Sequence, residues 1–491
     1  MNLENMDGWY QGEGVLYVYS GKNSGKGGYD HGYDFYGFTS PYRLPGITVS
    51  SVKRPYAENY SSGVPLTGGV EGGRFGSAMF SLRYDPVRRS YANDIKANKS
   101  YFLFDKEIVC LGSGICDTSG TETLTVVDSR YTDSIARRAN IRKVKSQELL
   151  NNGQVQGDRE RPEDSFIGCK QLFTVNGNKI DLSFENSAIN RQTVANFDNF
   201  DGFAANLEGV GGYIVPTVEG KEQSLEVRLR DNVNVFFELT LSHGKYPCDE
   251  MYAYYVLPDA TEKETLDYAT ALKKRESSVA SVVVHSTNMH AVKKQLDGIC
   301  YLGVNCFDIG RINASDIDPS SQEEVALSMP RAGAAFLCAQ RVDDTVRLTV
   351  NISDPTQQLK YTTLSLTPSL LFPDLISSGA ALARIEQSER SKQDPKLPFE
   401  SILPGLGRVD VKLPLYGADI TEAVLSTDRE GADRDLCGYD CTVAVTPTPY
   451  CNGEDKLEGS AFITADQRLQ VIADLSFNIG DTKSVTLVYK L

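Results

Sequence analysis

The stretch 63–85, GVPLTGGVEGGRFGSAMFSLRYD, places a carboxylate and a guanidinium in a glycine-rich turn just ahead of an alternating strand. Glu71 lies between Val70 and Gly72, and Arg74 follows three residues later. Glycine permits positive φ and lets a ligand or another backbone approach closely, so a carboxylate here can be held against something in a cleft. The alternative is a surface hairpin with a solvated glutamate.

A second candidate is the aromatic and glycine-rich run 8–49, which contains Trp9, the only tryptophan of the chain, and Tyr42. Pyranose rings present apolar C–H patches to aromatic faces and hydroxyl groups to polar side-chain tips. Exposed aromatic residues in β-loops are therefore typical of a sugar-binding face. The alternative is that these aromatic side chains belong to the core of a large sandwich.

The four histidines, His31, His243, His285 and His290, do not have the spacing of metal ligands. His31 could act in acid–base chemistry with a neighbouring tyrosine, although a solvated loop histidine is the simpler interpretation. We expect His285 and His290 to be structural. Nucleophile-elbow, Walker and dinucleotide-binding motifs are absent from the sequence, so the residues alone supply no complete catalytic set.

Ten cysteines are scattered along the chain without the repeating spacing of a disulfide framework. The only close trio, at 437, 441 and 451, has no histidine nearby. We expect reduced or partly buried thiols, no metal and no cofactor.

The elements that must position these groups are mostly β-strands. With 491 residues the chain can form several domains around a large core. Short alternating runs, separated by Gly, Asn, Asp and Ser, recur at 15–20, 77–85, 99–113, 122–132, 213–219, 224–242 and 250–258. A period of two suits strands with one buried face, and frequent turns favour an antiparallel sandwich over βαβ units. The run 261–276 predicts one amphipathic helix, with Thr261 and Glu264 spaced as a capping box.

A change in character after the helix predicts a domain boundary near residue 276, with domains at 1–276 and 277–491. The second part predicts strands within 277–308, two strands joined by a turn at Asp343 and Asp344, and strands at 407–415, 442–449, 459–465, 469–477 and 484–491. The polar segment 315–324 is expected to be a loop, and 380–396 is polar and compatible with a helix. The fold class is therefore all-β, a large antiparallel β-supersandwich followed by a smaller antiparallel β-sandwich.

The net charge of −15 argues against nucleic-acid binding, because a phosphate backbone selects for clustered Lys and Arg. No run approaches the ~18 apolar residues of a membrane span, and the N-terminus lacks the basic start and apolar core of a signal peptide. We therefore expect no nucleic acid and no membrane as partners.

Five segments in order resemble the central β-supersandwich of polysaccharide lyase family 8, the hyaluronate, chondroitin and xanthan lyases. They are GWYQGEGVLYVY, PYRLPGITV, VEGGRFGSAMFSL, KSYFLFDKEIVCLGSGI and ETLTVVDSR, and GGYIVP and SHGKYPCDEMYAYYVLPDAT follow in the same order. The resemblance covers residues 5 to about 355, and the loop at Glu71 is most similar to the chondroitin ABC type.

The resemblance implies β-elimination at a uronic acid, in which a base removes the C5 proton and a donor protonates the departing glycosidic oxygen. Glu71 is implied as the carboxylate that orients the acid–base groups. Trp9, Tyr42, Arg43 and Arg74 are the implied substrate-binding residues. The partner is an acidic polysaccharide, a glycosaminoglycan, and the family acts in a secreted or periplasmic setting.

In this family the catalytic His, Tyr and Arg come from an N-terminal α/α-toroid, and no helical pairs that could form one are predicted here. We therefore expect a β-domain portion that supplies one wall of a sugar cleft, with a separately encoded toroid chain as a candidate partner. One alternative is a non-catalytic carbohydrate-binding or interaction module. Another is a self-contained lyase that uses His31, Tyr33 and Glu71.

Overall fold

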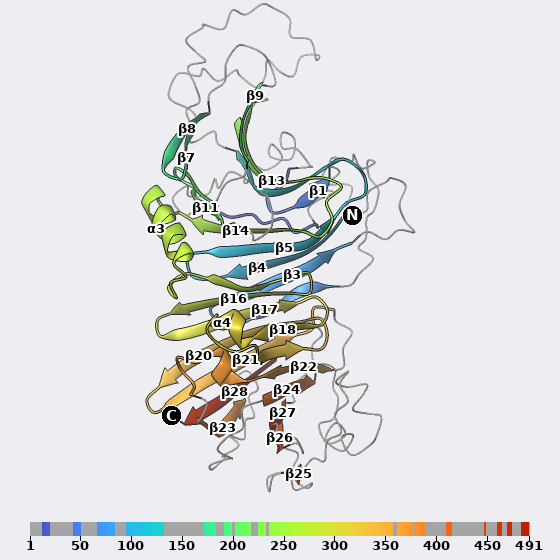
Figure 1. Cartoon of the computed structure of the whole chain (residues 1–491), viewed down its shortest axis with the longest axis vertical. Helices are drawn as coiled ribbons and strands as arrows, with labels where there is room; N and C mark the ends of the chain where they lie inside the picture. Colours follow the sequence, from blue (N-terminus) through green and yellow to red (C-terminus); the bar gives the residue numbers. More distant parts are fainter. Residues whose placement is uncertain are drawn as a thin grey trace, which may run out of the picture.

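The computed structural model describes residues 12–19, 43–50, 66–83, 95–131, 171–182, 191–198, 202–217, 224–231, 235–356, 361–377, 380–387, 409–414, 446–447, 459–463, 469–473 and 483–490. These residues form four β-sheets, stacked one on the next along the long axis of the molecule (Figure 1). The fold is all-β and dominated by antiparallel pairing, as the sequence predicts.

The first two sheets come from the N-terminal half. The five-stranded sheet has the order β1 (Thr48–Ser50), β6 (Glu122–Tyr131), β13 (Val235–Lys245), β12 (Ser224–Asp231) and β9 (Arg191–Asp198). The nine-stranded sheet has the order β2 (Thr67–Glu71), β3 (Gly76–Leu82), β4 (Lys96–Leu103), β5 (Ile108–Cys116), β14 (Glu250–Pro258), β11 (Gly211–Val215), β10 (Phe203–Leu207), β7 (Gln171–Val175) and β8 (Asn178–Leu182).

Two seven-stranded sheets follow. The third sheet has the order β15 (Ser281–His285), β16 (Met289–Leu296), β17 (Ile299–Cys306), β20 (Gly333–Val342), β21 (Thr345–Ser353), β28 (Lys483–Lys490) and β23 (Ala381–Gln387). The fourth sheet has the order β18 (Gly310–Asn313), β19 (Val325–Met329), β22 (Tyr361–Leu366), β24 (Val409–Pro414), β27 (Leu469–Ala473), β26 (Gly459–Ile463) and β25 (Thr446–Pro447). One pair departs from the antiparallel expectation, because β24 and β27 run parallel.

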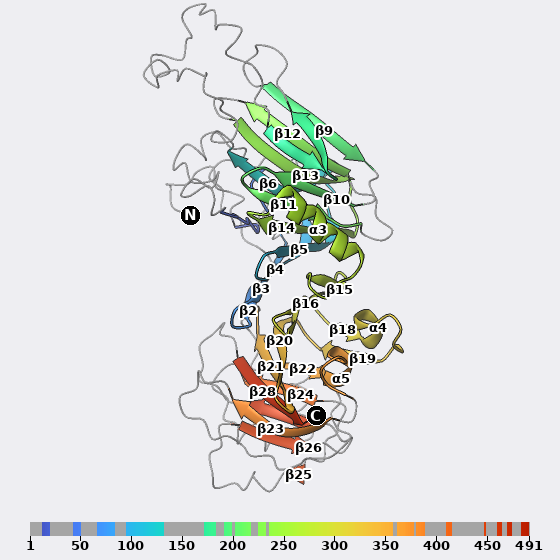
Figure 2. The ribbon, with the colours of Figure 1, turned by 90° about the vertical axis from the view of Figure 1, so that its left-hand side faces the viewer.

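Each of the two middle sheets contributes side chains to two cores, one on each face. On β4, Tyr101 belongs to the core shared with the five-stranded sheet, whereas the next residue, Phe102, belongs to the core shared with the third sheet. Successive side chains of a strand point to opposite faces, so neighbouring residues of one strand can serve two different cores. Figure 2 shows the same layers from the side.

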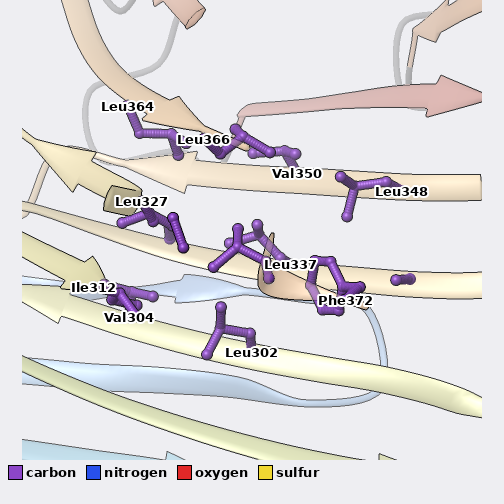
Figure 3. Packing of buried hydrophobic residues seen from close by; sticks show 14 of the residues in the cluster. Leu302, Val304, Ile312, Leu327, Leu337, Leu348, Val350, Leu364, Leu366 and Phe372 are labelled. Atoms are coloured by element: carbon purple, nitrogen blue, oxygen red, sulfur yellow. The ribbon is translucent and has the colours of Figure 1, made fainter. Parts of the chain in front are cut away.

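The third core lies between the third and fourth sheets. Leu302, Val304 and Leu337 of the third sheet meet Leu327 and Leu364 of the fourth (Figure 3). All five side chains are completely inaccessible to solvent. Burying an aliphatic side chain of this size stabilises a fold by about 1.5–3 kcal/mol, so this interface is a strong one.

The predicted helix is confirmed as α3 (Glu262–Lys273). Thr261 and Glu264 form the expected capping box, with the Glu264 side chain accepting from the Thr261 backbone N–H at 2.8 Å. α3 packs over β10 and β11, where the Asn206 amide donates to the Thr265 hydroxyl at 3.1 Å. No helix in the described residues is both long and apolar enough to span a membrane.

Three local predictions are wrong. Residues 381–387 of the helix-compatible segment 380–396 form strand β23, because β28 from the chain's C-terminal region offers an edge to pair with. Val15–Tyr19 is not a strand, and Leu16 donates instead to the carbonyl of Pro45 at 2.9 Å. The expected loop 315–324 is confirmed for 318–324 and wrong for 315–317, which belong to a short helix, α4 (Ala314–Ile317). A second short helix, α5 (Pro368–Leu371), was not predicted. The predicted turn at Asp343 and Asp344 is confirmed between β20 and β21.

Candidate functional site

The hairpin that carries Glu71 forms the edge of the nine-stranded sheet. Glu71 is the last residue of β2 and pairs with Gly76, the first residue of β3. Its side chain is exposed, whereas Val70 beside it is buried. The strand pair therefore holds the carboxylate at the sheet margin, where it faces solvent.

The turn after Glu71 is fixed against the third sheet. A Cβ atom added at Gly72 would lie 2.1 Å from the Phe336 ring, so only glycine allows this approach. The Cys338 thiol donates to the Gly72 carbonyl at 3.7 Å. Phe75 lies edge-on to Tyr301, with ring centroids 4.9 Å apart. These contacts fix the turn and therefore hold Glu71 in a defined position.

Arg74 in this turn already contacts two carboxylates. Its guanidinium pairs with Asp105 in the β4–β5 turn and with Asp297 in the β16–β17 turn, the latter at 3.4 Å. It also lies over the Phe75 ring, 5.1 Å from the centroid. The positive charge of Arg74 is therefore offset within the protein, and its contacts tie three turns together.

The other predicted substrate-binding residues do not gather around Glu71 in the described structure. Arg43 is half-buried beside the five-stranded sheet, where its Nη1 lies 3.6 Å from the Glu226 carboxylate of β12. Trp9 and Tyr42 lie outside the described residues, as do His31 and Tyr33. Among the predicted site residues that the structure describes, Glu71 and Arg74 share one turn, and Arg43 lies elsewhere.

A buried polar layer between the first two sheets was not predicted. Lys99 on β4 is completely inaccessible, and its ammonium donates to the Gly46 carbonyl. The Tyr101 hydroxyl donates to the Gly14 carbonyl at 2.6 Å. Both side chains therefore hold the N-terminal segments against the sheet. The sequence did contain a sign of this layer. Lys99 alternates with Ala97 and Tyr101, whose side chains point towards the core, so its own side chain had to point there too.

Burial changes the titration of this layer. Loss of solvation lowers the pKa of Lys99 to about 7, with nearby Cys110 and Glu13 acting in the opposite direction. Burial, followed by the nearby Lys99, lowers the pKa of His243 to about 3. The His243 Nε2 makes a hydrogen bond of 2.8 Å with the Thr125 hydroxyl, so the imidazole is held neutral and in place.

A second unpredicted polar group joins the nine-stranded sheet to the third sheet. Both ring nitrogens of His290 on β16 form 2.8 Å hydrogen bonds, with Ser100 of β4 and Ser113 of β5. His285 contacts the Gly112 carbonyl at 2.9 Å, and burial lowers its pKa to about 4. His285 and His290 are structural, as expected. Their spacing in the sequence did not indicate that they form hydrogen bonds with another sheet.

The described part of the chain holds no group of three or more His, Cys, Asp or Glu side chains that could bind a metal ion. Its three histidines are buried or half-buried and hydrogen-bonded, which leaves none of them placed to take a proton from a bound sugar. What the described site offers is an exposed carboxylate on an anchored edge hairpin.

Residues 1–196 match the family described as polysaccharide lyase family 8, super-sandwich domain.

Two curated relatives extend the match along the chain. A hyaluronate lyase of Thermasporomyces composti is 27% identical over 379 residues, covering 72% of this chain and 41% of that protein. The hyaluronate lyase HylB of Enterococcus faecalis is 25% identical over 378 residues, covering 74% of this chain and 32% of that protein. The chain thus spans less than half the length of these relatives.

The fold is similar to that of a Paenibacillus xanthan lyase, with a TM-score of 0.54 at 17% identity. The likeness covers 100% of this chain and 46% of that protein.

Proposed function

We propose that the chain is the β-domain portion of a glycosaminoglycan lyase of polysaccharide lyase family 8. The observation that carries the proposal is the match of residues 1–196 to that domain, together with relatives named as hyaluronate lyases. The proposed substrate is an acidic polysaccharide of the chondroitin or hyaluronan type. Since such polymers are extracellular, the proposed working compartment is secreted or periplasmic.

The proposed reaction is β-elimination. A base takes the C5 proton of a uronic acid, and an acid protonates the glycosidic oxygen as the C4–O bond breaks. The adjacent carboxylate must be neutralised, because otherwise the C5–H is too weak an acid. In this scheme Glu71 forms part of one cleft wall and orients groups supplied by an α/α-toroid, encoded separately or elsewhere in a longer protein.

The geometry refines the role of Arg74. Its guanidinium is occupied by Asp105 and Asp297, so we propose that it positions the Glu71 turn and does not bind a uronate. Arg43, Trp9 and Tyr42 remain proposed sugar contacts. For Arg43 the contact would compete with Glu226, because one guanidinium would have to serve two carboxylates.

A second candidate function is a carbohydrate-binding module without catalysis. The observation in its favour is that all three described histidines are engaged inside or between sheets. On this candidate Glu71 is a solvated turn residue.

Affinity electrophoresis with chondroitin sulfate and with hyaluronan tests both candidates, alongside the ultraviolet absorbance of unsaturated uronate. We expect the isolated chain to bind and to produce no unsaturated product. Glu71→Gln should change the affinity several-fold, because it alters a charge on the proposed cleft wall, whereas Glu208→Gln, in the exposed β10–β11 turn, should not. Robust elimination by the isolated chain would refute the β-domain proposal. Unchanged binding by Glu71→Gln would favour the second candidate, and absence of binding to either polymer would exclude both.

A further inference from the structure

Two cysteines far apart in the sequence lie near each other at the end of a strand pair. Cys116 is the last residue of β5, and Cys248 lies in the turn between β13 and β14. β5 and β14 run side by side in the nine-stranded sheet (Figure 1). Both thiols are free, Cys116 being half-buried and Cys248 exposed.

The hydrogen bonds set the register of the two residues. The backbone N–H of Asp117 donates to the carbonyl of Pro247 at 3.1 Å. In an antiparallel pair, the residue before one partner lies opposite the residue after the other, which places Cys116 opposite Cys248. Such a neighbouring pair is separated by about 4.5–5.5 Å between Cα atoms, within the range that a disulfide spans.

An extra residue brings the sulfur of Cys116 to its partner. Further along the pair Glu250 lies opposite Ile115, so Asp249 is one residue too many and forms a bulge. Its backbone has φ 55°, the left-handed conformation that such a bulge uses. The Asp249 N–H donates to the Cys116 Sγ at 3.2 Å. The sulfur therefore touches the peptide group that directly follows Cys248.

A cation lies near the same sulfur. The guanidinium of Arg83 interacts electrostatically with Cys116, and it is held by the carbonyls of Leu82 and Ala97 at 2.7 and 3.1 Å. The Cys116 sulfur therefore lies beside an amide donor and near a guanidinium.

We propose that Cys116 and Cys248 form a reversible disulfide, with a small-molecule disulfide such as oxidised glutathione as the oxidant. The exposed Cys248 thiolate attacks one sulfur of glutathione disulfide and releases one glutathione thiol. Cys116 then attacks the mixed disulfide at the Cys248 sulfur and releases the second glutathione. The pair loses two electrons and two protons, and the oxidant gains both.

The cross-link would lie beside the contact between the nine-stranded and third sheets. The Thr287 hydroxyl of the β15–β16 turn donates to Asp249 at 2.8 Å, and the Asn98 amide donates to the Thr287 carbonyl at 2.7 Å. Oxidation therefore fixes the turn that this network uses, and it closes a long loop of chain.

Other described thiols lack this arrangement. Cys300 and Cys338 lie on neighbouring strands, but Cys300 pairs with Ala339 and Cys338 with Tyr301, so the two side chains point to opposite faces. Cys110 and Cys306 are buried in different cores. Selectivity for the 116–248 pair is expected from geometry alone.

Peptide mapping of the full chain tests the proposal. The protein is incubated with oxidised glutathione, blocked with N-ethylmaleimide, digested and analysed by mass spectrometry without reductant. We expect a Cys116–Cys248 linked peptide that dithiothreitol abolishes, and a melting temperature raised by about 3 °C or more relative to the reduced protein.

Cys116→Ser and Cys248→Ser should each abolish the linked peptide and the shift, whereas the matched control Cys338→Ser should retain both. Cys116 and Cys248 both carrying N-ethylmaleimide after oxidation would overturn the proposal, as would linkage of either one to a different cysteine. A lasting Cys248–glutathione adduct without the internal bond would also overturn it. The mapping of the unmodified sequence decides the matter even if a serine variant fails to fold.

Discussion

Arg74 in the β2–β3 turn forms an ion pair with Asp297 in the β16–β17 turn, with 3.4 Å between Nη1 and Oδ2. The two residues belong to different sheets and are separated by 223 positions in the sequence. The hairpin that presents Glu71 is therefore tied directly to the C-terminal half of the chain.

Replacing Arg74 by alanine should reduce stability only slightly. The side chains of Arg74 and Asp297 are 54% and 71% exposed, and exposed pairs contribute about 1 kcal/mol or less. Urea unfolding measures the change. If the pair matters mainly as a tie for the turn, proteolysis within the β2–β3 hairpin should increase more than global stability falls. Lys263→Ala, which removes an exposed pair on α3, is the control and should change neither measurement. A loss of several kcal/mol for Arg74→Ala would contradict this description.

Removing Lys294 should be far more damaging. Its ammonium pairs with Glu107, and the two side chains are 4% and 0% exposed. Lys294→Ala leaves a carboxylate buried without its cation, at a cost of about 3–5 kcal/mol. Denaturant unfolding checks the value. The double variant Lys294→Met with Glu107→Leu should recover much of the loss, since it removes both charges. A double variant no more stable than Lys294→Ala would show that the pair is not the cause.

Acidic pH should lower the free energy of unfolding through His285, which joins the third sheet to the nine-stranded sheet. Burial lowers its folded pKa to about 4, below the ordinary value near 6.5, so the unfolded chain binds more protons between these values. Stability is therefore retained above pH 6.5 and falls as the pH drops towards 4. The loss from this group is about 2–3 kcal/mol at pH 4.5. Urea midpoints between pH 4.5 and 7.5 should show a shallower slope for His285→Gln, whose amide can still donate to Gly112. An unchanged slope would exclude His285 as a source of acid sensitivity.

Lys99 should make stability depend on pH on the alkaline side. Its folded pKa of about 7 lies below the value of 10.5 for a solvated lysine, so the folded state gains stability as the pH rises above 7. Between pH 7 and 9 this group contributes about 2 kcal/mol. Lys99→Met should remove that gain, and the difference from the wild-type protein isolates it from ionisation of thiols. Parallel stability curves for the two proteins would show that Lys99 does not titrate in this range.

The sequence pattern predicted the elements whose formation depends on residues close together in the chain. Period-two runs predicted most strands, the spacing of Thr261 and Glu264 predicted the α3 cap, and Asp343 with Asp344 predicted a turn. The prediction for 380–396 was wrong because β23 exists only through its pairing with β28, about a hundred residues later in the chain. Val15–Tyr19 alternates like a strand, yet Leu16 bonds to Pro45 and does not join a ladder of a sheet.

The candidate site likewise has features that the local sequence determines and features that only the tertiary structure determines. The sequence by itself determined the hairpin, its glycines and the exposed Glu71, because strand period and turn composition are local properties. Only the tertiary structure decided that Arg74 is shared between Asp105 and Asp297 and that His290 forms hydrogen bonds with Ser100 and Ser113. It also decided that the Cys116 sulfur accepts from the peptide N–H that follows Cys248. The physical reason is that stacking and register bring together side chains whose separation along the chain carries no information about their separation in space.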